Sequence, residues 1–185
     1  MKEIHNFIDK SICDLIIQAS TPGFKKAKVV GDQIDGGEFR IADSYWFDNK
    51  DDISKRVRGL ISEEVGISIN NMERLHIVRY KIGGEYKEHY DFFDEGSEYY
   101  HECTKKGGQR TKTALIYLND DFTGGETSFP ILGIDVKPEV GKMIVWDNMD
   151  EFGCCKYESL HAGRPVLSGE KYIAIVWFRQ NSIDV

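Results

Sequence analysis

The chain has 185 residues, of which 41% are hydrophobic and 12% aromatic, and its formal net charge at pH 7 is −7. This size and apolar content suit a single domain, residues 1–185, with a buried core, whereas the acidic charge argues against a nucleic-acid partner. No stretch approaches the roughly 18 apolar residues of a membrane span, and the four cysteines form no CxxC pair, so we expect no membrane partner and a cytoplasmic protein with reduced thiols.

Two segments in the first part of the chain have the spacing of amphipathic helices. Apolar residues recur every three or four positions in DKSICDLIIQAS, where Asp9 or Ser11 can form the N-cap. The pattern returns in DDISKRVRGLISEEVG, with Asp51 or Asp52 at its start and Gly66 at its end. Between them, glycines and an aromatic run in GDQIDGGEFRIADSYWF indicate strands and loop. We expect both helices to lie against another element.

From residue 72 onward the chain consists of short β-branched and aromatic runs separated by Gly, Pro, Asn and Asp. They are MERLHIVRY, TKTALIYL, ETSFP, IDVKP, GKMIVWD and EKYIAIVWF. Many short strands with such punctuation predict a sandwich or barrel. We therefore predict a mainly β (α+β) fold, with 1–71 as a support region and 72–185 as the β core. The polar segment 94–110 is expected to be an exposed loop between two strands.

The stretch EHYDFF places His89 and Asp91 two positions apart. On an extended strand, residues i and i+2 point to the same face about 6.6 Å apart, so both side chains can reach one metal ion. The best candidate for a third ligand is His161, in SLHAGRPV just before the last strand. Two histidines and one carboxylate, with vacant positions opposite, are typical of non-haem iron(II) oxygenases. The alternative for this pair is an exposed polar patch without a metal.

The final predicted strand, EKYIAIVWF, is apolar on both faces. Alternation places Lys171 on the same face as Ile173, Ile175 and Trp177. An unpaired buried ammonium group costs several kcal/mol. Lys171 therefore either extends into water at the start of the strand or meets a fixed anion, such as a bound carboxylate.

Five segments, in order, make the chain resemble the prolyl 4-hydroxylase group of the iron(II)- and 2-oxoglutarate-dependent dioxygenases. They are RYKIGGEYKEHYDFF, KKGGQRTKTALIYLND, GGETSFP, VKPEVGKMIVWDN and SLHAGRPVLSGEKYIAIVWFR. An HxD pair, a distal histidine and a lysine ten positions later form a specific combination. The resemblance covers residues 72–179 strongly, and it implies a double-stranded β-helix, or jelly-roll, core.

The resemblance also implies the cofactors and the residues that bind them. His89, Asp91 and His161 would bind Fe(II), and Lys171 would pair with the distal carboxylate of 2-oxoglutarate. Molecular oxygen would be the second co-substrate, and ascorbate would serve as a reductant. The reaction expected is hydroxylation of a prolyl residue in a peptide or protein, with succinate and carbon dioxide as co-products.

Further residues receive roles from the same resemblance. Tyr80 would hydrogen-bond the co-substrate, and Thr113 and Trp177 would line its pocket. For these three residues, ordinary core packing is the alternative. Arg110 and Arg40 would face the peptide substrate, although for Arg110 we favour the interpretation as a solvated loop arginine.

Departures from the family pattern leave other functions open. Ile41 and Ala42 stand where the family carries hydroxyl side chains on a wall facing substrate. The same oxygenase chemistry on a non-prolyl substrate is therefore an alternative. A jelly-roll module that binds a metal without turnover is a second, opposed by the retention of all three candidate ligands. A nucleic-acid demethylase is a third, weakened by the acidic charge.

Overall fold

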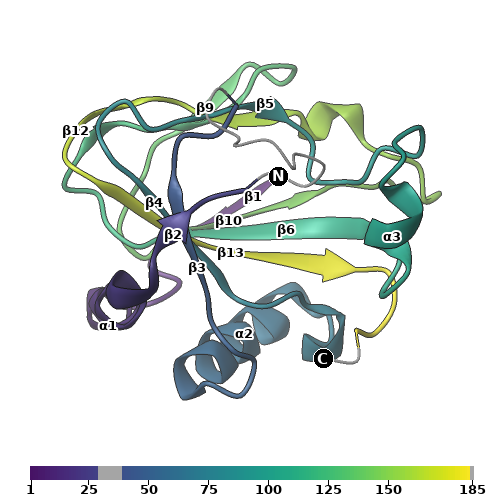
Figure 1. Cartoon of the computed structure of the whole chain (residues 1–185), viewed down its shortest axis with the longest axis horizontal. Coiled ribbons are helices and arrows are strands. Elements are labelled where there is room, and N and C mark those ends of the chain that lie inside the picture. Colours follow the sequence, from purple (N-terminus) through teal and green to yellow (C-terminus); the bar gives the residue numbers. More distant parts are fainter. Residues whose placement is uncertain (29–38, 184–185) are drawn as a thin grey trace.

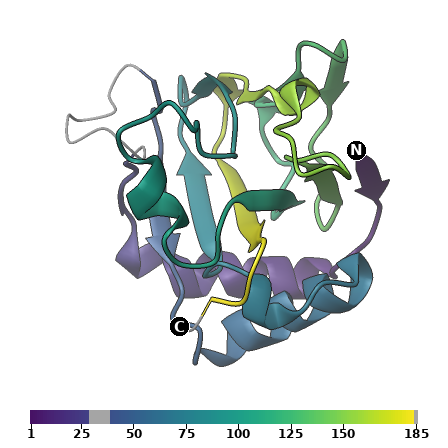
Figure 2. The same ribbon diagram turned by 90° about the vertical axis from the view of Figure 1, so that its right-hand side faces the viewer.

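Helices and strands form separate layers in the computed structural model, which describes residues 1–28 and 39–183 (Figure 1). The helices α1 (Lys10–Ser20) and α2 (Asp52–Val65) lie together along one side of the strands. The views in Figures 1 and 2 agree that both helices cover the same side. This arrangement confirms the predicted β core with helices packed outside it.

Both helices begin and end where the sequence predicts. Asp9 is the N-cap residue of α1, although its side chain makes no capping hydrogen bond. At α2, the Asp51 carboxylate accepts hydrogen bonds from the backbone N–H groups of Ile53 and Ser54, at 2.8 and 3.3 Å. Gly66 ends α2 with a φ of 73°, in the left-handed region that glycine adopts without strain.

Seven antiparallel strands form the larger sheet. Their order is β1–β10–β6–β13–β4–β3–β2, and their respective bounds are Lys2–Ile4, Met143–Asp147, Arg110–Tyr117, Lys171–Arg179, His76–Tyr80, Asp43–Trp46 and Lys25–Lys26. The central strand, β13, pairs with β6 on one side and with β4 on the other. Strands that are distant in the chain therefore meet at the middle of this sheet.

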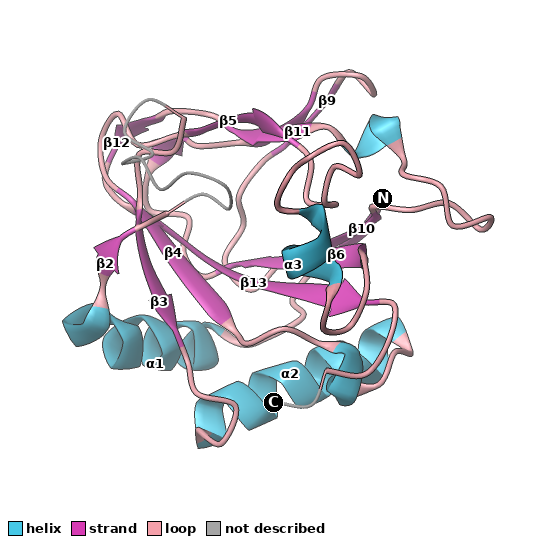
Figure 3. Ribbon diagram, turned by 45° about the vertical axis from the view of Figure 1, so that its right-hand side comes forward, coloured by secondary structure: helices cyan, strands magenta, loops and turns pink. Residues whose placement is uncertain are grey.

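A smaller antiparallel sheet lies across from the larger one, on the side away from α1 and α2 (Figure 3). Its order is β5–β11–β8–β9, with respective bounds Tyr86–His89, His161–Gly163, Thr127–Phe129 and Ile134–Val136. The short strands β7 (Thr123–Gly124) and β12 (Val166–Ser168) form a separate pair. The two facing sheets build the double-stranded β-helix that the resemblance to the dioxygenases implies.

The two faces of β13 belong to two different hydrophobic cores. Ala174, Val176 and Phe178 pack on the helix side, in the same cluster as residues of α1 and α2. Ile173 and Trp177 point the other way, into the space between the sheets. The alternation read from EKYIAIVWF is thereby confirmed. The second core is where the functional residues gather.

The sequence patterns missed several short elements, including an edge strand and a short helix. β1 pairs with β10, so the first residues of the chain form an edge of the larger sheet. The helix α3 (Tyr100–Thr104) lies within segment 94–110, which was wrongly expected to be loop throughout. A polar helix of little more than one turn has no apolar periodicity that could reveal it.

Three strands of the region 1–71 join the same sheet as strands of the region 72–185. The composition of the chain changes at residue 71. The division into a support region and a β core at this residue stays a prediction. Among the helices of the described residues, none combines the length and the apolar character that crossing a membrane requires.

Candidate metal centre and its pocket

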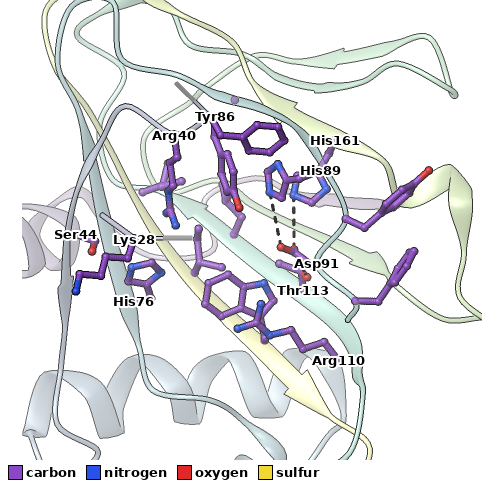
Figure 4. A pocket seen from close by; sticks show the side chains of 18 of the residues that line it. Lys28, Arg40, Ser44, His76, Tyr86, His89, Asp91, Arg110, Thr113 and His161 are labelled. Atoms are coloured by element: carbon purple, nitrogen blue, oxygen red, sulfur yellow. Dashed lines mark hydrogen bonds and ion pairs between the residues drawn. The ribbon is translucent and has the colours of Figure 1, made fainter. Parts of the chain in front are cut away.

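His89, Asp91 and His161 come together in the space between the sheets (Figure 4). His89 ends β5, His161 begins β11, and the two residues are paired across these strands. Nε2 of His89 lies 3.9 Å from Oδ1 of Asp91, and Nε2 of His161 lies 3.6 Å from Oδ2. The candidate ligand atoms all lie within 4.8 Å of one another. One cation with bonds of about 2.1 Å can contact all three side chains.

The route by which Asp91 reaches this cluster differs from the prediction. β5 ends at His89, and Asp91 lies in the bend that follows. The expected placement of both side chains on one face of a single strand is therefore wrong. The turn of the chain after β5 directs the Asp91 carboxylate toward both imidazoles instead.

The backbone orients both imidazole rings toward Asp91. Nδ1 of His89 lies 2.7 Å from the Lys87 carbonyl oxygen, and Nδ1 of His161 lies 2.8 Å from that of Ser159. With Nδ1–H donating to a carbonyl, the lone pair of each ring is left on Nε2, the atom that faces Asp91. Two imidazole Nε2 atoms and one carboxylate form the donor set that suits non-haem Fe(II). The residues present fit this ion.

Asp91 is held in place by a short chain of hydrogen bonds. The Thr113 hydroxyl donates to Asp91 Oδ2 at 2.7 Å, and the Asn148 amide donates to the Thr113 oxygen at 2.8 Å. Thr113 and Asn148 are fully buried, and Asp91 is 6% exposed. The structure thus gives Thr113 a direct contact with a candidate ligand, beyond the pocket-lining role expected. No sequence signal identified Asn148.

Burial and the neighbouring charges shift the pKa values of this cluster. Burial, with a contribution from His161, lowers the pKa of His89 to about 3. For Asp91, burial acts to raise the pKa, but the two histidines, Arg110 and the hydrogen bond from Thr113 together outweigh it and lower the pKa overall. The cluster therefore presents a neutral imidazole and an ionised carboxylate, the forms that bind a metal.

Lys171 is buried beside the cluster, with 2% of its surface exposed. Its Nζ donates a 2.7 Å hydrogen bond to the Gly125 carbonyl and lies 5.2 Å from the centre of the Tyr80 ring. Burial lowers the pKa of Lys171 to about 7, although Glu126 acts to raise it. No carboxylate of the described residues forms an ion pair with it. Of the two alternatives for Lys171, extension into water is wrong.

Gly125 leaves space for the Lys171 side chain. A Cβ added at Gly125 would lie 3.1 Å from Cδ of Lys171 and 3.0 Å from the Phe122 ring. The φ of Gly125 is +68°, in the left-handed region where other residues are strained. A glycine at this position therefore keeps open the path that the ammonium group follows into the cavity.

The candidate ligands and Lys171 line one cavity of about 760 Å³, a size common for small-molecule sites. Ile173, Ile175 and Trp146 form part of its apolar wall. The Trp146 ring packs edge-on against His161, with ring centres 4.8 Å apart. These side chains keep water away from one side of the cluster.

Two tyrosines connect the ligand cluster to the remainder of the cavity. Tyr80, the last residue of β4, is 3% exposed and lies opposite Lys171 across the two strands. Tyr86 stacks on His89, with ring centres 3.5 Å apart and an interplanar angle of 18°. Burial raises the pKa of Tyr86 to about 12, so its hydroxyl stays protonated. The sequence had indicated Tyr80 but not Tyr86.

Arg110 does not occupy the solvated loop position considered for it. It is the first residue of β6, its side chain is 11% exposed, and its Nε and Nη2 contact the Glu73 carboxylate at 2.7 and 2.8 Å. Its guanidinium carbon lies 3.9 Å from the centre of the Trp177 ring. Glu73 also pairs with Arg179 at 2.8 Å, and Arg179 donates to the carbonyls of Cys103 and Lys106. This buried network ties Arg110 to the segment that contains α3.

Arg40 lines the cavity as expected, but the residues after it do not. Ile41 is 47% exposed, and neither it nor Ala42 contributes to the cavity wall. The expectation that these two residues remove hydroxyl groups from a substrate-facing wall stays a prediction, because they lie outside the lining of this cavity. The hydroxyl side chain on this part of the wall belongs to Ser44, on β3.

Residues 75–179 match the family model described as the 2OG-Fe(II) oxygenase superfamily. A protein of Acanthamoeba polyphaga mimivirus, which carries the provisional name prolyl 4-hydroxylase, is 34% identical over 98% of this chain and 74% of its own length. Prolyl 4-hydroxylase 5 of Arabidopsis thaliana is 30% identical over 98% of this chain and 68% of its own length.

A solved structure agrees with the sequence matches. The viral collagen prolyl hydroxylase of Paramecium Bursaria Chlorella virus-1, in its 2OG complex, superposes with a TM-score of 0.76. It is 30% identical, and the match covers 96% of this chain and 94% of that one.

Proposed function

Because the chain belongs to the 2OG-Fe(II) oxygenase superfamily and is an iron(II)- and 2-oxoglutarate-dependent dioxygenase, we propose that it hydroxylates prolyl residues of a peptide or protein. The observation that carries the proposal is the cavity in which His89, Asp91 and His161 converge beside the buried Lys171. The relatives named prolyl 4-hydroxylases support a prolyl substrate.

In this proposal, His89, Asp91 and His161 hold the iron and Lys171 receives the distal carboxylate of 2-oxoglutarate. When bound there, iron(II) and 2-oxoglutarate would supply the oxidation chemistry, in which one oxygen atom of O₂ would convert a substrate C–H into C–OH and the other would enter succinate, with release of carbon dioxide. The carbonyls of Lys87 and Ser159 keep both Nε2 atoms directed at the ion. Thr113 fixes the carboxylate ligand through its hydroxyl.

Lys171 and Tyr80 form a polar end in an otherwise apolar part of the cavity. Neither the ammonium group nor the phenol has a carboxylate partner among the described residues. A carboxylate of 2-oxoglutarate would give Lys171 the counter-ion that burial otherwise denies it. The walls at Ile173 and Trp146 keep this end dry, which strengthens the ion pair. Trp177 lines the opposite part of the cavity, against Arg110.

Arg110 and Arg40 stay our candidates for contact with the peptide. Both line the cavity, and both lie against aromatic rings, Arg110 over Trp177 and Arg40 over Tyr86 at 4.7 Å. Aromatic and guanidinium groups together are typical of surfaces that bind extended, proline-containing peptides. No observation favours a non-prolyl substrate over this one.

Two further expectations stay predictions. Ascorbate as reductant follows only from the resemblance to prolyl 4-hydroxylases. The cytoplasmic location is supported by the cysteines, since Cys13, Cys103, Cys154 and Cys155 are all free thiols.

The proposal is tested by incubating the protein with proline-containing peptides, iron(II) and 2-oxoglutarate. Mass spectrometry should show one added oxygen atom on a proline, in a 1:1 ratio with succinate. Peptides in which that proline is replaced by alanine are the control and should give no oxygenated product. Succinate formed with oxygen on another residue, or on a non-peptide substrate, would contradict the prolyl assignment.

A further inference from the structure

Among the described residues that line the cavity, basic side chains outnumber carboxylates, although the chain as a whole is acidic. The basic residues that line it are Lys25, Lys26, Lys28, Arg40, Arg110 and Lys171. The carboxylates that line it, among the described residues, are Asp91 and Asp94. Asp91 belongs to the ligand cluster, and Asp94 accepts a 2.9 Å hydrogen bond from the backbone N–H of Gly96. On a chain of net charge −7, this local excess of positive charge indicates an anionic ligand.

Two of the buried cations already have a role. Arg110 shares the Glu73 carboxylate with Arg179, and Lys171 lies where the co-substrate carboxylate would bind. Arg40 is different: it is 6% exposed, and in the described part of the chain no carboxylate pairs with it. Its guanidinium contacts the neutral Tyr80 hydroxyl, and its Nε has no hydrogen-bond partner. A buried guanidinium without a counter-ion is costly. A ligand that supplies the missing acceptor would remove this cost.

His76 lies on the same side of the cavity as Arg40 (Figure 4). It is 2% exposed, and neither of its ring nitrogens has a hydrogen-bond partner among the described residues. Its ring stacks on Trp46 at 3.9 Å and 10°, which fixes its orientation. Burial, together with Arg40 and Arg110, lowers the pKa of His76 well below its usual value. The neutral ring therefore offers one N–H donor to a ligand in the cavity.

Ser44 and Lys28 complete this part of the wall. Both line the cavity, and Figure 4 shows them beside His76 and Arg40, apart from the ligand cluster. We call the set Lys28, Arg40, Ser44 and His76 the anion recess. It combines two cationic groups with a hydroxyl and an imidazole N–H, all of which can donate hydrogen bonds to a carboxylate.

The anion recess lies one aromatic ring away from the candidate metal site. The guanidinium carbon of Arg40 is 4.7 Å from the centre of the Tyr86 ring, whereas His89 stacks on that ring at 3.5 Å. Because His89 covers one face of the ring, Arg40 lies over the other. An extended or polyproline II peptide advances about 3 Å per residue. Arg40 is thus within about two or three residues of a proline held at the metal.

We propose that the anion recess binds the side-chain carboxylate of an aspartate or glutamate located within three residues of the target proline. The substrate would then be an acidic, proline-containing peptide segment. This inference rests on the proposed prolyl hydroxylase function and adds a sequence preference to it. The planar guanidinium of Arg40 suits a carboxylate, which it can bind through two parallel hydrogen bonds.

The test compares peptides that differ at one position. Peptides acetylated and amidated at their ends carry one proline and either Asp or Asn at each position up to three residues before or after it. At one position, kcat/KM should be about tenfold higher with Asp than with Asn, mainly through KM, as for a hydrogen bond between charged groups. A preference below twofold at every position would overturn the inference alone. No oxygenation of any peptide would overturn the proposed function and this inference with it.

Variants locate the preference in the anion recess. In Arg40→Gln and in Lys28→Gln the ratio of Asp to Asn rates should fall toward one, whereas the exposed Lys137→Gln, which removes the same charge outside the cavity, should keep it. His76→Phe should weaken binding of the Asp peptide and leave that of the Asn peptide nearly unchanged. A tenfold preference that persists in Arg40→Gln would overturn the inference. An Arg40→Gln variant whose KM rises for 2-oxoglutarate, with an unchanged peptide preference, would place Arg40 in the co-substrate site instead.

Discussion

The hydroxyl of Thr113 donates a 2.7 Å hydrogen bond to Oδ2 of Asp91, the oxygen that lies 3.6 Å from Nε2 of His161. Thr113 is on β6, Asp91 follows β5, and His161 begins β11, so this contact joins the larger sheet to the smaller one. Asn148 donates to Thr113 in turn. The geometry of the candidate metal centre therefore depends on how the two sheets pack.

We expect Thr113→Val to weaken iron binding by about tenfold or more. The substitution conserves shape but removes the donor to Asp91 and leaves the Asn148 amide without its acceptor. Thr113→Ser retains the hydroxyl and is the matched control. Anaerobic titration with Fe(II), or with Co(II) as a spectroscopic substitute, measures the affinities. Equal affinities for the valine and serine variants would show that this hydrogen bond does not position Asp91.

Lys171→Met should raise the concentration of 2-oxoglutarate needed for half-maximal rate by about a hundredfold and leave Fe(II) affinity within about twofold. The variant keeps a side chain of similar length but removes the buried charge, worth about 1.5–3 kcal/mol in a charged hydrogen bond. Succinate formation at varied 2-oxoglutarate and varied iron separates the two effects. Similar losses for both would argue against Lys171 as the carboxylate anchor.

The affinity for 2-oxoglutarate should fall as the pH rises above about 7. Burial lowers the pKa of Lys171 to about 7 in the free protein, so the ammonium group that attracts a carboxylate is lost above this pH. The affinity for 2-oxoglutarate should fall by at most about tenfold for each pH unit. Binding measured calorimetrically between pH 6.5 and 9 tests this, with Lys171→Arg as control, because a guanidinium stays charged. The same slope in both proteins would assign the pH dependence to another group.

The Lys171 ammonium group also affects folding stability in the absence of 2-oxoglutarate. The folded-state pKa of Lys171 is depressed below the unfolded value near 10.5. Between these two values the unfolded chain binds one more proton than the folded one, so this group's contribution to stability increases as the pH rises. Below pH 7 the buried Lys171 side chain is charged, and its burial then lowers the folding stability the most. Added 2-oxoglutarate should therefore raise the melting temperature more at pH 7 than at pH 9.

Glu73→Gln should lower the free energy of unfolding by about 3 kcal/mol. The single Glu73 carboxylate is the shared counter-ion of Arg110 and Arg179, so removal of its charge leaves two buried guanidinium groups without a counter-ion. The control is Glu64→Gln, which breaks an exposed pair with Lys2 and should cost less than about 1 kcal/mol. Urea titration of both variants measures the difference. Equal destabilisation would mean that the buried network contributes no more than a surface ion pair.

Much of the fold could be predicted because periodicity and burial agree along the chain. β13 shows this most clearly, since its alternating residues divide between the two cores as the pattern requires. The N-cap of α2 and Gly66 at its end could also be predicted, because a helix cap depends only on residues adjacent in the sequence. β1 and α3 carry no such pattern. The first forms because β10 offers an unpaired edge, and the second lies in a polar segment held by Arg179.

The candidate site divides in the same way. The metal ligands could be identified from the spacing of His89 and Asp91 and from the position of His161 before the last strand. Lys171 could be identified because a charged side chain on an apolar strand face is energetically unfavourable. Thr113 was identified, but its contact with Asp91 was not, since it joins residues of different sheets. Arg110 was considered a solvated residue because its partner, Glu73, lies 37 positions earlier. Long-range pairs of this kind depend on the fold, and no spacing along the chain predicts them.

The central claim is that His89, Asp91 and His161 share one iron ion and leave room for 2-oxoglutarate. Anaerobic addition of Fe(II) and 2-oxoglutarate should produce a visible charge-transfer band in the wild-type protein and in His101→Ala, which changes an exposed histidine outside the cavity. The band should be absent in His161→Ala. A band of undiminished intensity in His161→Ala would contradict the account, because the third ligand would then lie elsewhere.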